Sequence, residues 1–248
     1  MIRINCSSVA LLAPLAFLFA ACGSEASEPI EADLGSATLG LSADAVPSLG
    51  AASQFAALGA ATVTCANSST VSGDVGVSPG TAITGFGAGC TLSGAIHAGD
   101  ESANQAHSDL FTAFDALQAA ECEHELTGQD LGGQTLAPGV YCFDTTAGLT
   151  GALTLDGGGD SNAVWIFQIG TAMTTATGSS VVLAGGGRAN NVFWKVGSSA
   201  TLATATTFQG NVLALASVTL VSGAQLTGRA LALNAAVTLD HNAVTLPR

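Results

Sequence analysis

The sequence of 248 residues is poor in charge, and above all in basic residues. Charged residues make up 9% of the chain, and its five basic residues stand against 18 acidic ones, which gives a formal net charge of −13. A nucleic-acid-binding surface needs clustered lysines and arginines, so that class of partner is excluded. The same acidic balance favours solubility and opposes binding to acidic lipid headgroups.

Patterns for catalysis and metal binding are also missing. No G-x-S-x-G turn offers a serine nucleophile, the four histidines are scattered, and no CxxC pair indicates zinc. Asp156-Gly157-Gly158-Gly159-Asp160 faintly resembles a calcium-binding turn, but it occurs once and is interpreted as an ordinary turn. The repeated positions described below carry no acids for cleaving carbohydrates. We therefore expect no enzyme, no cofactor and no metal site.

What the chain has instead is 48% apolar residues and 31 glycines, a composition that suits a β-solenoid or another extracellular β protein. Short segments repeat one pattern, a threonine between apolar residues, and Thr201, Thr219 and Thr238 follow one another at intervals of 18 and 19 residues. A period near 20 residues indicates stacked units, none of which buries its apolar face alone. The repeat predicts a mostly β protein, a β-solenoid.

Seven such segments align on one threonine, with a small residue two positions earlier. Because a strand has a period of two, these two residues share one face, and their mostly apolar neighbours share the other. The alignment predicts two uncharged outward rows: Thr62, Thr84, Thr150, Thr174, Thr201, Thr219 and Thr238 in one, and Ala60, Ala82, Gly148, Ala172, Ser199, Ser217 and Ala236 in the other. The alternative is that the threonines reflect strand propensity alone.

One stretch has a different period. From Asp100 to about Glu123 the apolar residues recur at helical spacing, as Ala103, Leu110, Phe114 and Leu117. We expect one long helix there, lying along the stacked strands and covering one of their faces. The bulky runs 163–167 and 191–194 are expected to fill the interior or to pack against this helix.

The N-terminal region predicts export. Residues 1–22 combine Arg3 with an apolar stretch too short to span a bilayer comfortably, which is typical of a signal peptide. The stretch ends in Leu18-Phe19-Ala20-Ala21-Cys22, which resembles a bacterial lipoprotein box, so Cys22 is the expected lipidation site. The protein is then an outer-membrane or cell-surface lipoprotein, with plain secretion as the alternative. Residues 23–48 predict a flexible acidic linker, and the folded domain is expected over 49–248.

After the signal, an even number of cysteines remains, as expected for an exported protein with two disulfides. Four cysteines allow three pairings, and we favour the local ones, Cys65 with Cys90 and Cys122 with Cys142.

Several segments of residues 49–246 resemble the microbial ice-binding (antifreeze) family. They are Leu49-Gly50-Ala51-Ala52-Ser53-Gln54-Phe55-Ala56, Gly73-Asp74-Val75-Gly76-Val77-Ser78-Pro79-Gly80-Thr81-Ala82-Ile83-Thr84-Gly85-Phe86, Ile96-His97-Ala98-Gly99-Asp100, Leu136-Ala137-Pro138-Gly139-Val140-Tyr141, Val164-Trp165-Ile166-Phe167-Gln168-Ile169-Gly170 and Gly228-Arg229-Ala230-Leu231-Ala232. The resemblance implies a right-handed solenoid of triangular cross-section, closed out of sequence order, with a long α-helix packed alongside.

The resemblance also implies a function, adsorption to ice through a flat face that inhibits ice growth and recrystallisation. The family pattern T-A/G-x-T/N matches Thr81-Ala82-Ile83-Thr84 and Thr171-Ala172-Met173-Thr174, which adds Thr81 and Thr171 to the expected ice-binding residues. Together with the threonine row, and with Ser199 and Ser217 from the row of small residues, these residues form the predicted site. The expected partner of this monomer is the ice crystal surface, and a membrane is contacted only through the lipid. The alternative is an adhesin or a structural envelope protein without ice activity.

Overall fold

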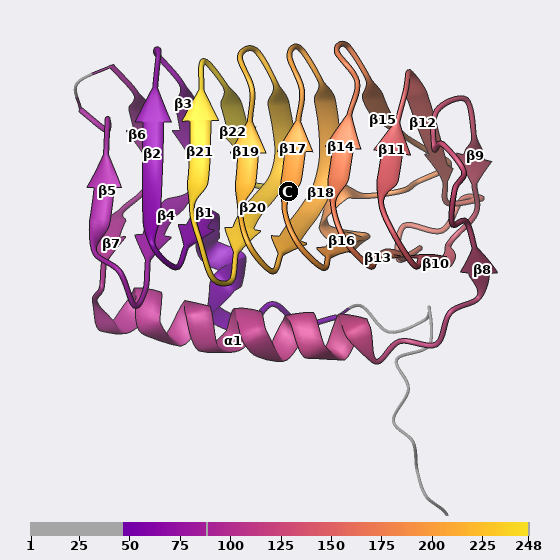
Figure 1. Cartoon of the computed structure of the whole chain (residues 1–248), viewed down its shortest axis with the longest axis horizontal. Helices are drawn as coiled ribbons and strands as arrows, with labels where there is room; N and C mark the ends of the chain where they lie inside the picture. Colours follow the sequence, from indigo (N-terminus) through magenta and orange to yellow (C-terminus); the bar gives the residue numbers. More distant parts are fainter. Residues whose placement is uncertain (1–46, 88, 248) are drawn as a thin grey trace, which may run out of the picture. The chain divides into compact units, whose positions relative to one another are not determined.

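In the computed structural model the chain winds in coils of parallel strands with one helix alongside (Figure 1). The structure describes residues 47–87 and 89–247. The predicted signal peptide, the predicted lipidation site Cys22 and all but two residues of the predicted linker lie outside these described residues. A full coil contributes strands to three stacks, which we call ladders 1, 2 and 3.

Ladder 1 is a seven-stranded sheet that faces the viewer in Figure 1. In spatial order it consists of β11 (Ala147–Leu149), β14 (Met173–Thr175), β17 (Ala200–Leu202), β19 (Val218–Leu220), β21 (Val237–Asp240), β2 (Thr62–Ala66) and β5 (Ala82–Thr84).

The other 15 strands form one sheet that continues around a corner within two long strands, β18 (Thr207–Ala214) and β20 (Gln225–Ala232). Their first parts belong to ladder 2, with β9 (Thr135–Leu136), β12 (Ala152–Asp156), β15 (Ser180–Ala184), β22 (Ala243–Thr245), β3 (Thr70–Ser72) and β6 (Thr91–Ser93). Their second parts belong to ladder 3, with β8 (His124–Glu125), β10 (Gly139–Phe143), β13 (Trp165–Ile169), β16 (Val192–Val196), β1 (Phe55–Gly59), β4 (Asp74–Val77) and β7 (Ile96–Ala98).

The interior of the coils is filled by the inward residues of all three ladders. Its bulkiest part is a column of aromatic rings, in which Phe167 stacks on Trp194 at a centroid distance of 3.9 Å. Tyr141 and Phe208 continue the column at 5.4 and 4.8 Å. The alternate residues of the same strands, such as Ile166, point to the opposite side and pack in a second cluster with the helix. The bulky runs therefore do both things that we expected, because they fill the interior with some side chains and pack against the helix with the others.

Helix α1 (Glu101–Gln118) covers ladder 3, which confirms the predicted long helix beside the strands (Figure 1). Its buried stripe includes Leu110, Phe114 and Leu117. The stripe packs on the outward apolar residues of ladder 3, which are Leu58, Val140, Ile166, Phe193, Leu213 and Leu231. Two short 3-10 helices, η1 (Gly50–Gln54) and η2 (Ala189–Asn191), complete the described elements.

The helix ends at Gln118, five residues before the predicted end at Glu123. The side chain of Gln168 donates hydrogen bonds to the carbonyl oxygens of Leu117 and Ala120, at 2.8 and 2.6 Å, and so caps the last turn. Beyond it the backbone N–H of Glu123 donates to Val140 at 3.1 Å, where the chain begins to pair with ladder 3. The tertiary pairing overrides the helical spacing of the sequence.

The coils close out of sequence order, as the family resemblance implied. The first coils of the domain pair with the last, since β2 lies against β21, β1 against β20, and β3 against β22. The chain must therefore travel from one end of the stack to the other before it continues. Helix α1 makes most of this passage, because 18 residues at 1.5 Å each extend about 27 Å.

Both predicted disulfides are confirmed. Cys65 is bonded to Cys90 and Cys122 to Cys142, with Cα atoms 6.3 and 5.9 Å apart. The first joins two neighbouring coils at one end of the stack. The second fixes the segment after α1 to strand β10.

A buried arginine joins the first and last parts of the domain. Arg229, on β20, is 7% exposed and donates through Nε to the carbonyl oxygen of Ser53 at 2.9 Å. Its Nη1 donates to the side-chain oxygens of Asn211 at 2.7 Å and Asn190 at 3.4 Å. Burial lowers the pKa of Arg229 to about 10, so the group stays charged at neutral pH. The hydrogen-bond acceptors of this cation are neutral oxygens, and none of them is a carboxylate of the described residues.

Replacing this arginine tests its role in closing the domain. We expect Arg229→Met to lower the free energy of unfolding by about 2–3 kcal/mol, because buried acceptors lose their donors. Urea denaturation followed by circular dichroism measures the change. The matched control is Arg188→Met at an exposed arginine. Equal midpoints for the two variants would contradict the role of Arg229.

A second prediction concerns the helix start. Asp100 caps α1 by accepting from the backbone N–H of Ala103 at 2.9 Å, and this bond, followed by the contact with His97, lowers the pKa of its carboxyl. The stabilisation is therefore present above the ordinary value of 3.8 and is lost as the pH falls through the lowered folded value. We expect Asp100→Asn, which keeps an acceptor, to be less stable than the parent at neutral pH. The gap in thermal midpoint should close in strong acid, and a gap that does not change with pH would contradict this account.

Candidate functional site

The candidate site is the outer face of ladder 1. Its strands alternate strictly, with buried residues such as Val218, Leu220 and Val237 inside and partly exposed Thr219 and Thr238 outside. This alternation follows from the two-residue period of a strand whose one face is buried. The repeated threonines of the sequence thus point away from the core.

Strand pairing places two uncharged rows on this face. Row 1 runs across the seven strands as Gly148, Thr174, Thr201, Thr219, Thr238, Thr64 and Thr84. Row 2 lies two residues earlier along the chain, at the first residue of a strand or directly before it, and consists of Thr146, Ala172, Ser199, Ser217, Ala236, Thr62 and Ala82. The rows are about 6.6–6.8 Å apart along a strand, and their members repeat every 4.7–4.9 Å across strands.

Neighbouring hydroxyls within a row touch. Ser217 donates from Oγ to Oγ of Ser199 at 3.0 Å, and Thr84 donates from Oγ1 to Oγ1 of Thr64 at 3.4 Å. Such contacts require neighbouring coils in register, so the hydroxyl positions are fixed by the backbone pairing.

Two of the predicted row 1 positions are wrong. Thr64, not Thr62, pairs with Thr238, and Thr62 moves to row 2, where it lies beside Ala82. The strand Thr62-Val63-Thr64-Cys65 offers two threonines of the same orientation, and a slip of two residues keeps every side chain on its face. Only the partner strand decides between them, so the sequence alone missed Thr64.

The other wrong position is Thr150. Gly148 occupies row 1 of β11, and Thr150 follows the strand, where its Oγ1 donates to a carboxylate oxygen of Asp130 at 3.1 Å. Row 2 shifts accordingly, so that Thr146 replaces Gly148 and Thr62 replaces Ala60. The cause is the same two-residue ambiguity.

The structure brings most of the remaining predicted residues together. Thr84, Thr174, Thr201, Thr219 and Thr238 lie in row 1, and Ser199 and Ser217 lie in row 2. Thr81 and Thr171 are exposed, but they lie in the turns before β5 and β14, outside both rows.

None of the seven members of either row is charged. Two buried cations, Lys195 and Arg229, are on ladder 3. The Lys195 ammonium lies 4.9 Å from the ring centroid of Phe114 on α1. Burial lowers the pKa of that ammonium group.

Two carboxylates adjoin the rows. Asp130 pairs with Gly148 and so continues row 1 by one position, and Asp240 follows Thr238 by two residues on β21, where it accepts a hydrogen bond from Asn67 at 2.7 Å. Ladder 1 therefore presents hydroxyl and methyl groups without charge along its rows.

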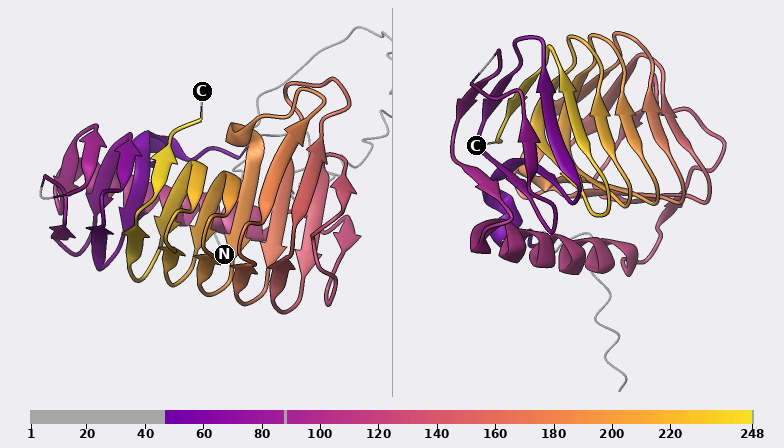
Figure 2. Two further views of the ribbon diagram at one scale, coloured as in Figure 1. Left: turned by 90° about the horizontal axis from the view of Figure 1, so that it is seen from above. Right: turned by 60° about the vertical axis from the view of Figure 1, so that its left-hand side comes forward.

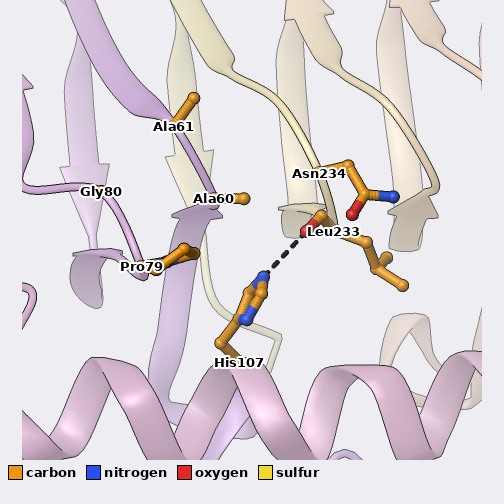
Figure 3. A pocket seen from close by; sticks show the side chains of 7 residues that line it. All are labelled: Ala60, Ala61, Pro79, Gly80, His107, Leu233 and Asn234. Atoms are coloured by element: carbon orange, nitrogen blue, oxygen red, sulfur yellow. Dashed lines mark hydrogen bonds between the residues drawn. The ribbon is translucent and has the colours of Figure 1, made fainter.

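Two pockets lie outside ladder 1. One, of about 490 Å³, lies between α1 and the turns below ladder 1, and is lined by small residues with His107, whose Nε2 is 2.8 Å from the carbonyl oxygen of Leu233 (Figure 3). Its lining contains one titratable side chain and neither a carboxylate nor a hydroxyl. It offers no pair of groups for acid–base or nucleophilic chemistry.

The second pocket, of about 410 Å³, contains His97. Its Nδ1 lies 2.8 Å from Asp100 and its Nε2 3.7 Å from Asp74, so both ring nitrogens face carboxylates. Neither nitrogen faces the nearby hydroxyl of Ser102, as a base activating a nucleophile would. Among residues 47–87 and 89–247, no three His, Cys, Asp or Glu side chains are grouped to hold a metal ion, and no helix is long and apolar enough to cross a membrane.

Comparison with known proteins agrees with the fold. The family model described as "Ice-binding-like" matches residues 57–245. An "Ice-binding protein" of Nostoc sp. (strain HG1) is 49% identical over 204 residues, covering 82% of this chain and 75% of that protein. "Ice-binding protein 1" of Shewanella frigidimarina is 36% identical, with 80% of this chain and 26% of that one covered.

Solved structures give the same result. The crystal structure of an ice-binding protein from the Antarctic ascomycete Antarctomyces psychrotrophicus matches with a TM-score of 0.80 and 44% identity, covering 82% of this chain and all of that one. An ice-binding protein from an Antarctic biological consortium matches with a TM-score of 0.80 and 40% identity, over 82% and 92% of the two chains. Because the family model matches residues 57–245, and because the relatives and solved structures agree with it, the chain belongs to the ice-binding-like family.

Proposed function

We propose that the protein binds ice through ladder 1 and thereby inhibits ice growth and recrystallisation. The observation that carries the proposal is the pair of in-register, uncharged rows across seven strands. The names of the relatives support it, since each is called an ice-binding protein.

The physical mechanism follows from rigidity. Hydroxyl and methyl groups on a fixed lattice order the water above them, and this water can merge with a growing crystal. Each contact is weak, but a face that is already ordered loses little entropy on binding, so many contacts add together. Protein adsorbed in this way forces ice to grow with a curved surface between the anchors, which lowers the local freezing point.

The alternatives explain the surface less well. An adhesin for polysaccharide would use exposed aromatic rings, yet Trp165, Trp194 and Tyr141 are buried. A structural envelope protein needs no rows of aligned hydroxyls on an open face. We propose accordingly a binding protein with no catalytic role.

Finer features of the proposal are the coil geometry and the location. We propose a right-handed solenoid of triangular cross-section, supported by the three ladders per coil and by the general preference of parallel β connections for a right-handed crossover. We also propose a monomeric, exported protein that is either tethered through a lipid on Cys22 or secreted, on the strength of the N-terminal sequence.

The test is a double substitution in the middle of row 1. We expect Thr201→Asp/Thr219→Asp to need at least about a tenfold higher concentration to stop ice recrystallisation, because each carboxylate keeps strongly bound water in a geometry that does not match ice and costs more than about 1.4 kcal/mol to desolvate. Recrystallisation of fine ice grains is followed by microscopy.

The control is Thr112→Asp on the exposed side of α1, and circular dichroism confirms that each variant is folded. Ice activity in the parent and in a folded double variant alike would move the site away from ladder 1. A parent without ice activity would contradict the proposed function and favour an adhesin or envelope role.

A further inference from the structure

Lys195 is the one lysine of the chain, and it is buried. It lies on the outward side of β16 in ladder 3, where it is 5% exposed beneath the last turns of α1. Helix α1 runs below the coils in the right-hand view of Figure 2, so this lysine is on a different side of the domain from rows 1 and 2. The proposed ice contact does not use it.

The ammonium group has an aromatic neighbour but no hydrogen-bond acceptor. The contact of Nζ with the Phe114 ring, at 4.9 Å from the centroid, is the interaction that this side chain makes within residues 47–87 and 89–247. The carbonyl oxygens of Leu117 and Ala120 at the helix end accept hydrogen bonds from Gln168 instead. Three N–H donors of a nearly buried cation are therefore without a partner in the part of the chain that the structure describes.

The unpartnered amine opens into a small pocket. A cavity of about 190 Å³ is lined by Lys195, by Gln118 from α1, and by residues of β10 and β13 with the turns after them, among them Asp144. No side-chain nitrogen or oxygen of the described residues is both closed off from solvent and without a hydrogen-bond partner. Because Nζ has no such partner, solvent reaches it, and the pocket is the route.

The surroundings of Nζ favour a positive charge and oppose a bound anion. The last turn of α1 carries the negative end of the helix dipole, and the face of the Phe114 ring is negative as well. The other titratable side chain in the lining is the carboxylate of Asp144, which makes no ion pair with Lys195. A ligand that suits this pocket is therefore neutral when it enters and leaves the positive charge on the nitrogen.

Burial also makes this amine a better nucleophile at neutral pH. It lowers the pKa of Lys195, so a larger share of this amine than of an exposed one is neutral at the same pH. A neutral lysine amine attacks carbonyl carbon and forms an imine. The protonated imine keeps the positive charge of the ammonium group but has one N–H in place of three.

We propose that Lys195 is a modification site that takes up a small aldehyde as an imine. The lone pair of Nζ forms a bond to the carbonyl carbon, and the carbonyl oxygen takes the proton that the nitrogen gives up. The resulting hydroxyl takes a second proton from solvent and leaves as water, and the nitrogen lone pair completes a C=N bond. The positive nitrogen stays beside the Phe114 ring, and two unpartnered N–H groups are gone. The step needs neither an oxidant nor a reductant.

The test lets two lysines of one molecule compete for the same probe. Thr112→Lys in the full chain adds an ordinary exposed amine on the outer side of α1. The probe is propanal at about pH 7, with cyanoborohydride to reduce each imine to a stable amine. Peptide mass mapping then quantifies the adduct at each lysine and separates both from the terminal amine.

We expect at least about threefold more adduct at Lys195 than at the introduced lysine, because more of the buried amine is neutral. The ratio should fall as the pH rises to about 10, where exposed amines also lose their protons. With 2-naphthaldehyde, whose fused rings are too bulky for the pocket, the introduced lysine should be the preferred site. Lys195→Arg keeps the cation, removes the amine and should lose the adduct at this position.

A folded variant with equal or less propanal adduct at Lys195 overturns the proposal. A preference for Lys195 that persists with 2-naphthaldehyde overturns it too, since the pocket would then play no part. Ser108→Lys, at an exposed position one turn earlier on α1, repeats the competition if Thr112→Lys does not fold by circular dichroism. These outcomes are independent of the ice assay, because Lys195 lies off rows 1 and 2.

Discussion

The structure depends on one constraint, the in-register parallel pairing of each coil with the next. Pairing places equivalent side chains of successive coils about 4.8 Å apart. A row of like charges at that spacing would cost about 0.9 kcal/mol for each neighbouring pair even in water. Threonine, serine and alanine avoid this repulsion, and threonine also suits a strand. The scarcity of charge in the chain is thus a requirement of the stacked rows and, at the same time, the property that the proposed ice contact needs.

Continuity of the face depends in turn on how the domain closes. Row 1 is unbroken only because Thr64, near the start of the domain, pairs with Thr238, near its end. This junction exists because α1 carries the chain to the far end of the stack, so that the later coils return to meet the earlier ones. Arg229 ties the two parts together at the same coils by donating to the backbone of Ser53. Long-range closure therefore positions residues that a local repeat could not align.

The sequence predicted what depends on local period, and it missed what depends on partners. The repeat near 20 residues, the helical spacing around Leu110 and the even cysteine count led to the solenoid, the helix and both disulfides. The sequence could not show that Thr64 and Gly148, and not Thr62 and Thr150, occupy row 1. A slip of two residues along a strand leaves every side chain on the same face, inward or outward. The end of α1 was missed for a related reason, since Gln168, on a distant strand, caps its last turn.

The distribution of charge over the three ladders completes the argument. Lys195 and Arg229 are placed on the one ladder that α1 covers, where a phenyl ring and neutral oxygens hold them. Acidic side chains such as Glu101 and Asp115 lie on the exposed side of the helix, where they favour solubility. No member of rows 1 and 2 is charged, and the nearest carboxylate on a strand of ladder 1 is Asp240, which follows Thr238 by two residues. The helix therefore does more than bridge the coils, because the ladder that it covers is also the one that holds the two buried cations, away from the rows that are proposed to contact ice.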